Sequence, residues 1–150
     1  MAMDDQDRAL LNRIQTRFPL SPHPFADIGK ELGMDEETVL RRVAALKESG
    51  IIRRIGGNFV PDKVGFVSTL CAAKVPVDRM DLFSRTVNAY PGVTHNYLRD
   101  NPYNVWFTFI APSMAVISAH LEDIENKTGV RPILNLPATR TFKIKAKFDL

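Results

Sequence analysis

Cysteine is nearly absent from this chain of 150 residues, in which Cys71 is the one example. An internal disulfide is therefore excluded, and the apolar run around Cys71 predicts a small buried side chain. The 3 histidines have no cysteine or histidine neighbour at the spacing of a zinc site, so we predict no metal site. No apolar run reaches the roughly 20 residues that span a bilayer, and the acidic N-terminus lacks the layout of a signal peptide. These absences predict a cytoplasmic protein without membrane contact.

A strong charge of either sign is also missing, because 20 basic residues stand against 17 acidic ones, a formal net charge of +3. This weak positive bias fits an anionic partner, such as nucleic acid or a polycarboxylate ligand, without choosing between them. Hydrophobic residues make up 45% and charged residues 25% of the chain, which is ordinary for a globular protein. A disordered or fibrous chain is excluded.

The first part of the chain predicts three helices, because apolar residues recur there every three or four positions. Their ranges are 4–18, 25–32 and 35–48. Gly33 ends the second helix, Asp35 is a suitable N-cap for the third, and Gly56-Gly57 indicates a hairpin of two short strands within 51–60. We therefore predict a winged helix-turn-helix domain over residues 1–60.

The second part of the chain predicts a different pattern, in which short strands alternate with helices. Strands are expected at 66–75, 93–98, 105–110 and 131–136, helices at 78–90 and 113–128, and a further extended piece at 141–148. The order β-α-β-β-α-β is the ferredoxin-like unit. The predicted fold class is α+β, with a ferredoxin-like domain over residues 61–150 that carries the ligand or active site.

Both parts resemble known proteins. Ile28 to Ile52, which includes IGKELGM and VLRRVAALKESGII, resembles the helix-turn-helix of Lrp/AsnC-type regulators. The second part departs from those regulators in two elements, HNY-x-R at His95 to Arg99 and YN-x-W-F at Tyr103 to Phe107. With these elements, FPL-xxx-PF at Phe18 to Phe25 and the closing FDL, the chain resembles siroheme decarboxylase subunits. The resemblance covers nearly the whole chain.

The resemblance implies removal of carbon dioxide from two acetate side chains of siroheme, which gives didecarboxysiroheme for haem or dioxo-type haem synthesis. No cofactor is then required, because the iron belongs to the substrate. Such a site needs a general acid, cations for the remaining carboxylates and a dry apolar slot for the flat ring. Since the family usually consists of two related subunits, and Lrp-type domains pair by packing their sheets together, a heterodimer is expected.

His95 is the candidate general acid, since imidazole exchanges protons near neutral pH. Strand alternation predicts that Val93, His95 and Tyr97 share one face and that Thr94, Asn96 and Leu98 share the other. Tyr97 is the second candidate catalytic residue, as a proton relay or an orienting group. Axial contact with the substrate iron, or an ordinary hydrogen-bonded place at a sheet edge, is the alternative role for His95.

The candidate substrate-binding residues are cationic, aromatic or amide side chains. They are Arg53, Arg54, Asn96, Arg99, Tyr103, Trp106, Arg140 and Lys143. The arginines suit carboxylates because a guanidinium binds them bidentately, and the aromatic rings suit a flat macrocycle. Arg53 and Arg54 have a second interpretation as phosphate contacts of a DNA-binding wing. Lys143, Lys145 and Lys147 alternate and would share one strand face. Each of these side chains can also be ordinary core or solvated surface.

Two other functions stay open. A DNA-binding regulator is disfavoured because the third helix starts with Asp35-Glu36-Glu37, and carboxylates at that end of a recognition helix are repelled by the duplex. A tetrapyrrole sensor would keep His95 and the aromatic residues without catalysis. A sensor returns siroheme intact, whereas the enzyme returns a product lighter by carbon dioxide.

Overall fold

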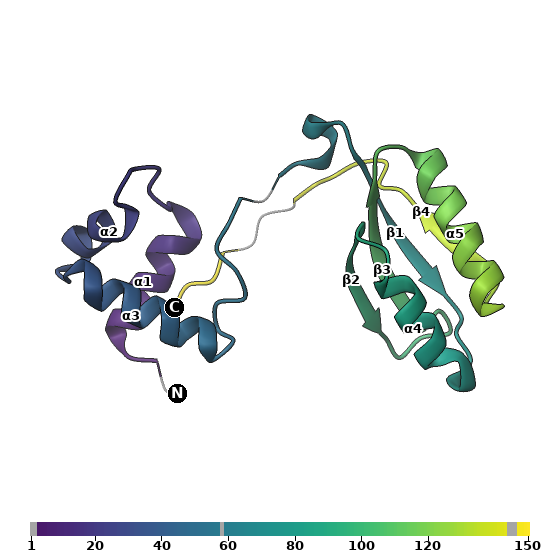
Figure 1. Ribbon diagram of the computed structural model, residues 1–150, viewed down its shortest axis with the longest axis horizontal. Coiled ribbons are helices and arrows are strands. Elements are labelled where there is room, and N and C mark those ends of the chain that lie inside the picture. Colours follow the sequence, from purple (N-terminus) through teal and green to yellow (C-terminus); the bar gives the residue numbers. More distant parts are fainter. Residues whose placement is uncertain (1–2, 58, 144–146) are drawn as a thin grey trace. The chain divides into compact units, whose positions relative to one another are not determined.

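The computed structural model describes residues 3–57, 59–143 and 147–150, which fall into two compact units (Figure 1). The first unit is Met1–Gly57 with Lys143–Leu150, and the second is Asn58–Phe142. Residues 143–150 thus group with the first unit by their contacts. The reason is that the backbone of Phe148 and Leu150 hydrogen-bonds to side chains of the first helix.

The first unit holds three helices in the order of a helix-turn-helix. They are α1 (Asp5–Thr16), α2 (Pro24–Leu32) and α3 (Glu36–Glu48). Asp4 and Asp7 form a capping box at the start of α1, and the Asp35 carboxylate accepts the backbone N–H of Thr38 at the start of α3. Gly33 has a left-handed φ of 67°, which turns the chain between α2 and α3. The apolar stripes meet in a core formed by Leu10, Leu11, Ile28, Val39, Val43, Leu46 and Ile52.

The predicted wing is wrong for the residues that the structure describes, because Ile51–Gly57 and residues 59–60 contain no strand. Instead, the backbone N–H of Ile52 donates to the Leu46 carbonyl at 3.0 Å, which turns the chain back over the core and buries Ile52. The residues that follow form no ladder, and a two-stranded ribbon alone has only marginal stability. Arg53 and Arg54 therefore lie on an irregular segment.

The second unit confirms the ferredoxin-like order. Its elements are β1 (Val67–Ala73), α4 (Met80–Asn88), β2 (Val93–Leu98), β3 (Val105–Ala111), α5 (Met114–Thr128) and β4 (Ile133–Leu136), with short 3-10 turns at Pro61–Val64 and Val77–Arg79. The strands lie in the order β2-β3-β1-β4, and each neighbouring pair is antiparallel. The extended piece predicted at 141–148 forms no strand in its described residues, 141–143 and 147–148.

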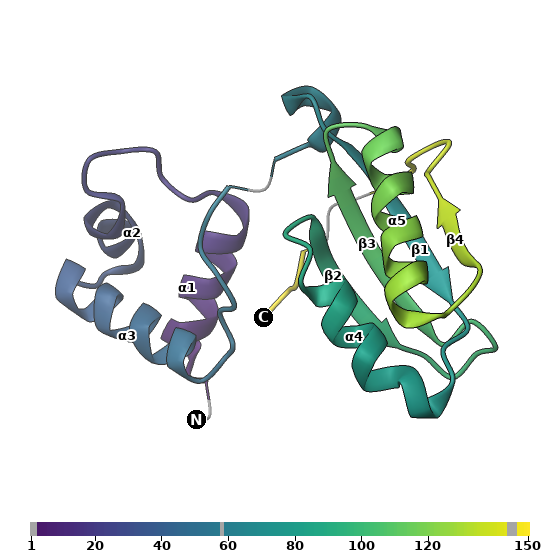
Figure 2. The same cartoon turned by 45° about the vertical axis from the view of Figure 1, so that its right-hand side comes forward.

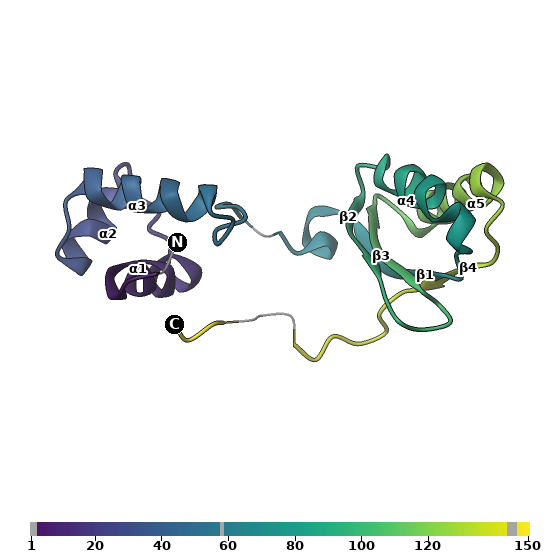
Figure 3. The ribbon, with the colours of Figure 1, turned by 90° about the horizontal axis from the view of Figure 1, so that it is seen from below.

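Helices α4 and α5 lie on one face of this sheet (Figures 2 and 3). Strand alternation buries every second residue of β3 beneath them, and Phe107 and Phe109 pack there with Phe83 of α4 and Ile117 of α5. Among the described residues of this unit, no helix covers the other side of the sheet. We call that side the open face.

Candidate functional site

The strand register fixes which side chains share the open face. Leu70 of β1 lies opposite Thr108, Tyr97 of β2 lies opposite Trp106, and residues that lie opposite one another point to the same side. The face therefore carries Ser68, Leu70, Ala72, His95, Tyr97, Trp106, Thr108, Ile110, Leu134 and Leu136. The neighbouring ladder positions place Cys71, Phe107 and Phe109 on the helix side.

A β-bulge at Thr94 decides the direction of His95. Val93 pairs with Phe109 while His95 pairs with Thr108, so that Thr94 is an extra residue in β2. The expectation that Val93 and His95 share a face is therefore wrong, and Val93 packs against the core on the helix side. The Thr94 hydroxyl lies 3.0 Å from Nδ1 of His95 and is its hydrogen-bond partner.

His95 and Tyr97 lie side by side on the open face. Their rings stack with centroids 5.9 Å apart and an interplanar angle of 28°. Both side chains are exposed, Tyr97 by 50%, so this unit by itself does not enclose them. An imidazole and a phenol are thus brought together where another molecule can reach both.

Arg99 and Trp106 form the basic and aromatic end of the same face. The Arg99 guanidinium carbon lies 5.8 Å from the centre of the Trp106 ring, and both border a shallow hollow of about 530 Å³ with Leu70, Asp100 and Asn101. The indole N–H of Trp106 donates to the Tyr103 carbonyl at 2.7 Å, while the Tyr103 ring lies 4.7 Å from the ammonium group of Lys74. The hollow presents an aromatic surface beside a cation.

Asn104 positions this end of the site, although no role was predicted for it. Its amide donates to the Val75 carbonyl and accepts the Val75 N–H, both at 2.8 Å, and its own carbonyl accepts the Arg99 N–H at 2.7 Å. The asparagine thereby fastens the β2–β3 connection to the end of β1. Its place inside YN-x-W-F was the signal that could have identified it.

The remaining candidate residues of the C-terminal half lie elsewhere. Asn96 is on the helix side, where its amide donates to the Asn88 side chain at 2.9 Å, and the structure does not group it with His95. Arg140 is exposed, with its guanidinium 5.0 Å from the Phe142 ring. Lys143 is exposed and groups with the first unit, and Lys145 lies outside the described residues.

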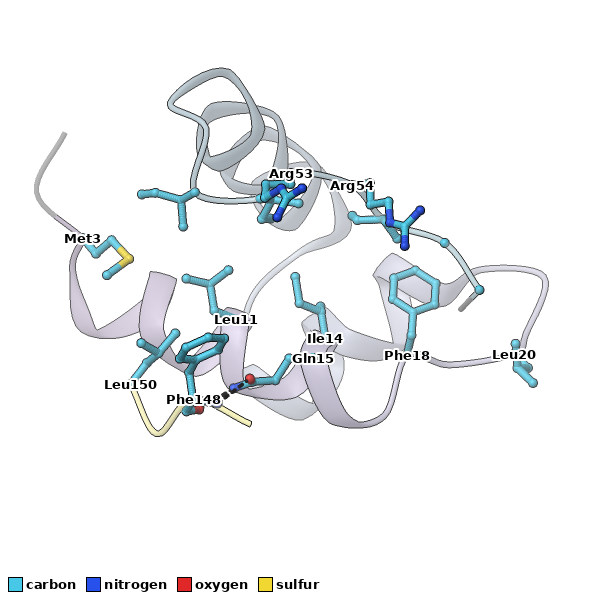
Figure 4. Close-up of a pocket in the computed structure, with 15 residues that line it drawn as sticks. Met3, Leu11, Ile14, Gln15, Phe18, Leu20, Arg53, Arg54, Phe148 and Leu150 are labelled. Carbon is cyan, nitrogen blue, oxygen red and sulfur yellow. Dashed lines mark hydrogen bonds between the residues drawn. The ribbon is translucent and has the colours of Figure 1, made fainter. Parts of the chain in front are cut away.

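The first unit contains a larger apolar hollow, of about 700 Å³, beside Arg53 and Arg54 (Figure 4). Its apolar walls come from α1 and the residues on either side of it, from the segment after α3 and from the end of the chain. They are Met3, Leu11, Ile14, Phe18, Leu20, Ile51, Ile52, Ile55, Phe148 and Leu150. Both arginines are exposed, and no carboxylate among the described residues pairs with them. We call this space the arginine hollow.

The charged side chains of α3 are in part paired within the first unit. Arg42 is held by the carboxylates of Asp4 and Asp7, at 2.9 and 2.8 Å, and is thus paired within the unit. The Asp7 backbone N–H and the Arg42 guanidinium lower the pKa of Asp4, so this pairing persists at neutral pH. Glu36 and Glu37 remain exposed in the first turn of α3, where they repel phosphate.

Cys71 and two of the histidines do not contribute to the open face. Burial raises the pKa of Cys71 to about 12, and the side chain lies in the core. His120 stacks on Phe109 on the helix side, and His23 is exposed at the start of α2. In the described part of the chain no three His, Cys, Asp or Glu residues are grouped as metal ligands, and no helix there has the length and apolarity to cross a membrane.

A helix-turn-helix followed by a sheet with one uncovered face defines the Lrp/AsnC class of proteins. The family described as AsnC-like ligand binding domain matches residues 63–143, and the siroheme decarboxylase NirDL-like HTH domain matches residues 7–53. The crystal structure of an AsnC family transcriptional regulator from Agrobacterium tumefaciens superposes with a TM-score of 0.77 at 23% identity, over 97% of this chain and 96% of that one. At that identity the likeness shows the fold alone.

Within this class, the chain is 61% identical to the siroheme decarboxylase alpha subunit of Desulfovibrio desulfuricans, over 99% of this chain and 85% of that subunit. It is 42% identical to the siroheme decarboxylase NirDL subunit of Paracoccus denitrificans, over 100% of this chain and 46% of that one. The chain therefore belongs to the family of siroheme decarboxylase subunits.

A solved structure of the same family agrees. The crystal structure of the siroheme decarboxylase NirDL in co-complex with an iron-uroporphyrin III analogue matches with a TM-score of 0.67 and 30% identity, over 95% of this chain and 48% of that one. The present chain thus spans about half the length of the NirDL proteins.

Proposed function

We propose that this chain is a subunit of a siroheme decarboxylase and that His95 supplies the protons for the reaction. The main observation in its support is that His95 and Tyr97 lie on the same uncovered sheet face as Arg99 and Trp106. Family membership supports the substrate, since the relatives are named for siroheme and one was crystallised with an iron-uroporphyrin III analogue.

The reaction converts each acetate side chain and one proton into a methyl group and carbon dioxide. The bond between the methylene and carboxylate carbons breaks, and its electron pair passes into the macrocycle, which accepts charge more readily after it has taken up a proton. The methylene carbon is then protonated while the macrocycle releases the proton that it had taken up, so that one proton is consumed for each carbon dioxide released. No electron is gained or lost overall, so the proposal requires no redox cofactor, and the iron is part of the substrate.

Each proposed residue has a role that its chemistry allows. His95 donates the proton, with its ring oriented by the Thr94 hydroxyl, and Tyr97 orients the substrate or relays the proton. Arg99 binds a carboxylate, and Trp106 provides a flat apolar surface for the ring. Further carboxylate or ring contacts are proposed for Arg53, Arg54, Asn96, Tyr103, Arg140 and Lys143.

A partner subunit would complete the site. Leu70 and Leu136 are each 42% exposed on the open face, and Tyr97 is 50% exposed. A second AsnC-like sheet packed against this face would cover these side chains and exclude water from the substrate. We propose a related subunit as that partner, consistent with relatives named alpha subunit and with NirDL chains of about twice this length.

Anaerobic incubation with siroheme, with this chain alone and with its related subunit, tests the proposal by mass spectrometry. The expected products are lighter by one and then by two carbon dioxide molecules. Replacing His95 with Ala should lower turnover roughly 10²- to 10⁴-fold and leave siroheme binding within a few-fold. His23→Ala, an exposed histidine of the first unit, is the matched control.

Two results would contradict the proposal. Near-normal turnover of His95→Ala would remove His95 as the acid. Siroheme that is bound but returned intact by the assembled subunits would instead make the chain part of a tetrapyrrole-binding sensor.

A further inference from the structure

The end of the chain is held on α1 by a pair of side-chain amides. Gln15 donates through Nε2 to the Phe148 carbonyl at 2.6 Å and accepts the Phe148 N–H through Oε1 at 3.0 Å. Asn12 donates to the Leu150 carbonyl at 2.8 Å, and the Leu150 N–H approaches its Oδ1 at 3.4 Å. Gln15 also donates to Asn12 at 3.0 Å, which aligns the two amides.

In this arrangement the two amides bind the backbone of an extended segment. Asn12 and Gln15 are three residues apart and so lie on one side of α1, and the residues that they bind are two apart along the chain. Residues two apart in an extended chain point to the same side, so Phe148 and Leu150 both enter the wall of the arginine hollow. Figure 4 shows Phe148 beside Gln15, with Arg53 and Arg54 across the hollow.

The docked side chains are not yet covered. Phe148 is 69% exposed and Leu150 is 42% exposed, although the backbone of both is bound. Much of these apolar surfaces is still exposed, so an apolar ligand in the hollow would gain free energy by covering them. The unpaired guanidinium groups of Arg53 and Arg54 on the same hollow favour a ligand that carries carboxylates.

We propose that Lys147–Leu150 is a ligand-coupled wall of the arginine hollow, docked through Asn12 and Gln15 and stabilised when a carboxylate-bearing apolar ligand fills the hollow. The ligand class is that of the proposed substrate, so this inference rests on the proposed function. Docking and ligand binding must then strengthen each other by the same factor, because thermodynamic linkage is reciprocal.

The docking itself is tested on the full chain without ligand, by amide hydrogen exchange. In the wild-type protein the Phe148 amide should exchange about tenfold or more slowly than in Gln15→Ala, because that substitution removes its acceptor. Arg8→Ala is the matched control, since Arg8 is an exposed residue of α1 whose side chain has no hydrogen bond or ion pair to residues 147–150 among the described residues. Equal exchange in the wild type and in Gln15→Ala would overturn the docking, whatever the activity.

The coupling is tested with siroheme as the probe, added anaerobically. Siroheme should slow the exchange of the Phe148 amide, and Phe148→Ala/Leu150→Ala should bind siroheme about threefold to tenfold more weakly, since it removes two apolar walls. The double variant removes only exposed side chains, so its fold should be intact by circular dichroism. Unchanged exchange on siroheme addition, with full affinity in the double variant, would overturn the coupling.

The two proposals can fail separately. Slower exchange on siroheme addition without any decarboxylation would support the coupled wall and contradict the proposed reaction. Decarboxylation with an unprotected Phe148 amide would support the reaction and overturn the coupled wall.

Discussion

The imidazole of His95 stacks on the phenol of Tyr97, with ring centroids 5.9 Å apart, and the extra residue Thr94 in β2 directs both rings to the open face. The Thr94 hydroxyl lies 3.0 Å from Nδ1 of His95, and Nε2 has no hydrogen-bond partner among the described residues. Nε2 is thus the ring nitrogen that is free to bond to another molecule. Because the two rings are in contact, a substitution of either one also affects the other, and the two substitutions should be interpreted together.

Tyr97→Phe should separate the two roles of the tyrosine. The ring and its stack on His95 remain, so stability should change little, because the hydroxyl has no partner among the described residues. Loss of one hydrogen bond to substrate should lower turnover about fivefold to tenfold. Steady-state turnover of siroheme measures the effect, and a Tyr97→Phe variant with full activity would assign the tyrosine to packing against His95.

Arg99 should act on binding more than on the chemical step. Arg99→Ala removes the guanidinium beside Trp106, and loss of a charge-assisted contact with a carboxylate should weaken siroheme binding about tenfold or more. Spectrophotometric titration of siroheme measures this affinity. The matched control is Arg131→Ala, another exposed arginine of the same unit, which contacts Glu125 and Asn126. Equal affinities of the two variants would place Arg99 in solvent.

Asn104→Ala should destabilise the second unit. It removes the two 2.8 Å hydrogen bonds to the Val75 backbone, which leaves a part-buried N–H and carbonyl without a partner. Such losses cost about 1–3 kcal/mol per group. Denaturant unfolding measures this, with Asn101→Ala as the control because Asn101 makes a single exposed hydrogen bond to the Tyr103 N–H. A cost equal to that of the control would contradict an anchoring role.

Gly92→Ala should disturb the bulge. A Cβ at Gly92 would lie 2.1 Å from the Ile110 carbonyl oxygen and 3.1 Å from the Phe109 ring, so the strands must separate. Overpacking of this kind costs about 1–3 kcal/mol, and it would also displace His95 two ladder positions away. Gly56→Ala, where a Cβ meets nothing within 4 Å, is the control, and both are compared by thermal unfolding. Equal melting temperatures would show that the strands tolerate the added carbon.

Cys71 should make stability fall at alkaline pH. Burial raises the pKa of the thiol from 9.0 to about 12, so the folded state keeps a proton that the unfolded state has lost in this range. The stabilisation is complete below about pH 9 and declines as the pH rises toward 12. Denaturant unfolding between pH 7 and pH 11 should therefore show a steeper decline than in Cys71→Ala. Identical pH profiles would contradict this assignment.

The periodic parts of the molecule were predictable from the sequence. Apolar spacing located the three helices of the first unit, and Asp35 and Ser113 cap helices as expected because the capping interaction is local. The alternation of β3 and the order β-α-β-β-α-β likewise follow from short-range pattern. The helix-turn-helix and the ferredoxin-like domain are both confirmed.

Four features depended on contacts that the sequence pattern does not encode. The bulge at Thr94 is set by pairing with β3, where Gly92 and Ile110 approach closely, so strict alternation misplaced Val93. The expected hairpin after α3 is replaced by an irregular segment that borders a hollow. The docking of Phe148 on Gln15 joins residues that are 133 positions apart in the chain. Neither a phenylalanine nor a glutamine by itself predicts such a contact. Asn104 was missed because its partners are backbone groups of another strand.

The return of Phe148 and Leu150 to α1 also affects how the polypeptide matures. During synthesis, Asn12 and Gln15 leave the ribosome more than a hundred residues before the segment that they bind, as the separations of 133 and 138 positions show. The apolar core around Leu10 and Ile28 can assemble early. The contacts of α1 with Phe148 and Leu150, however, cannot form until the whole second unit has been translated. A nascent chain that stalls before residue 147 would therefore expose the docking side of α1, with Asn12 and Gln15 unpaired, to chaperones or proteases.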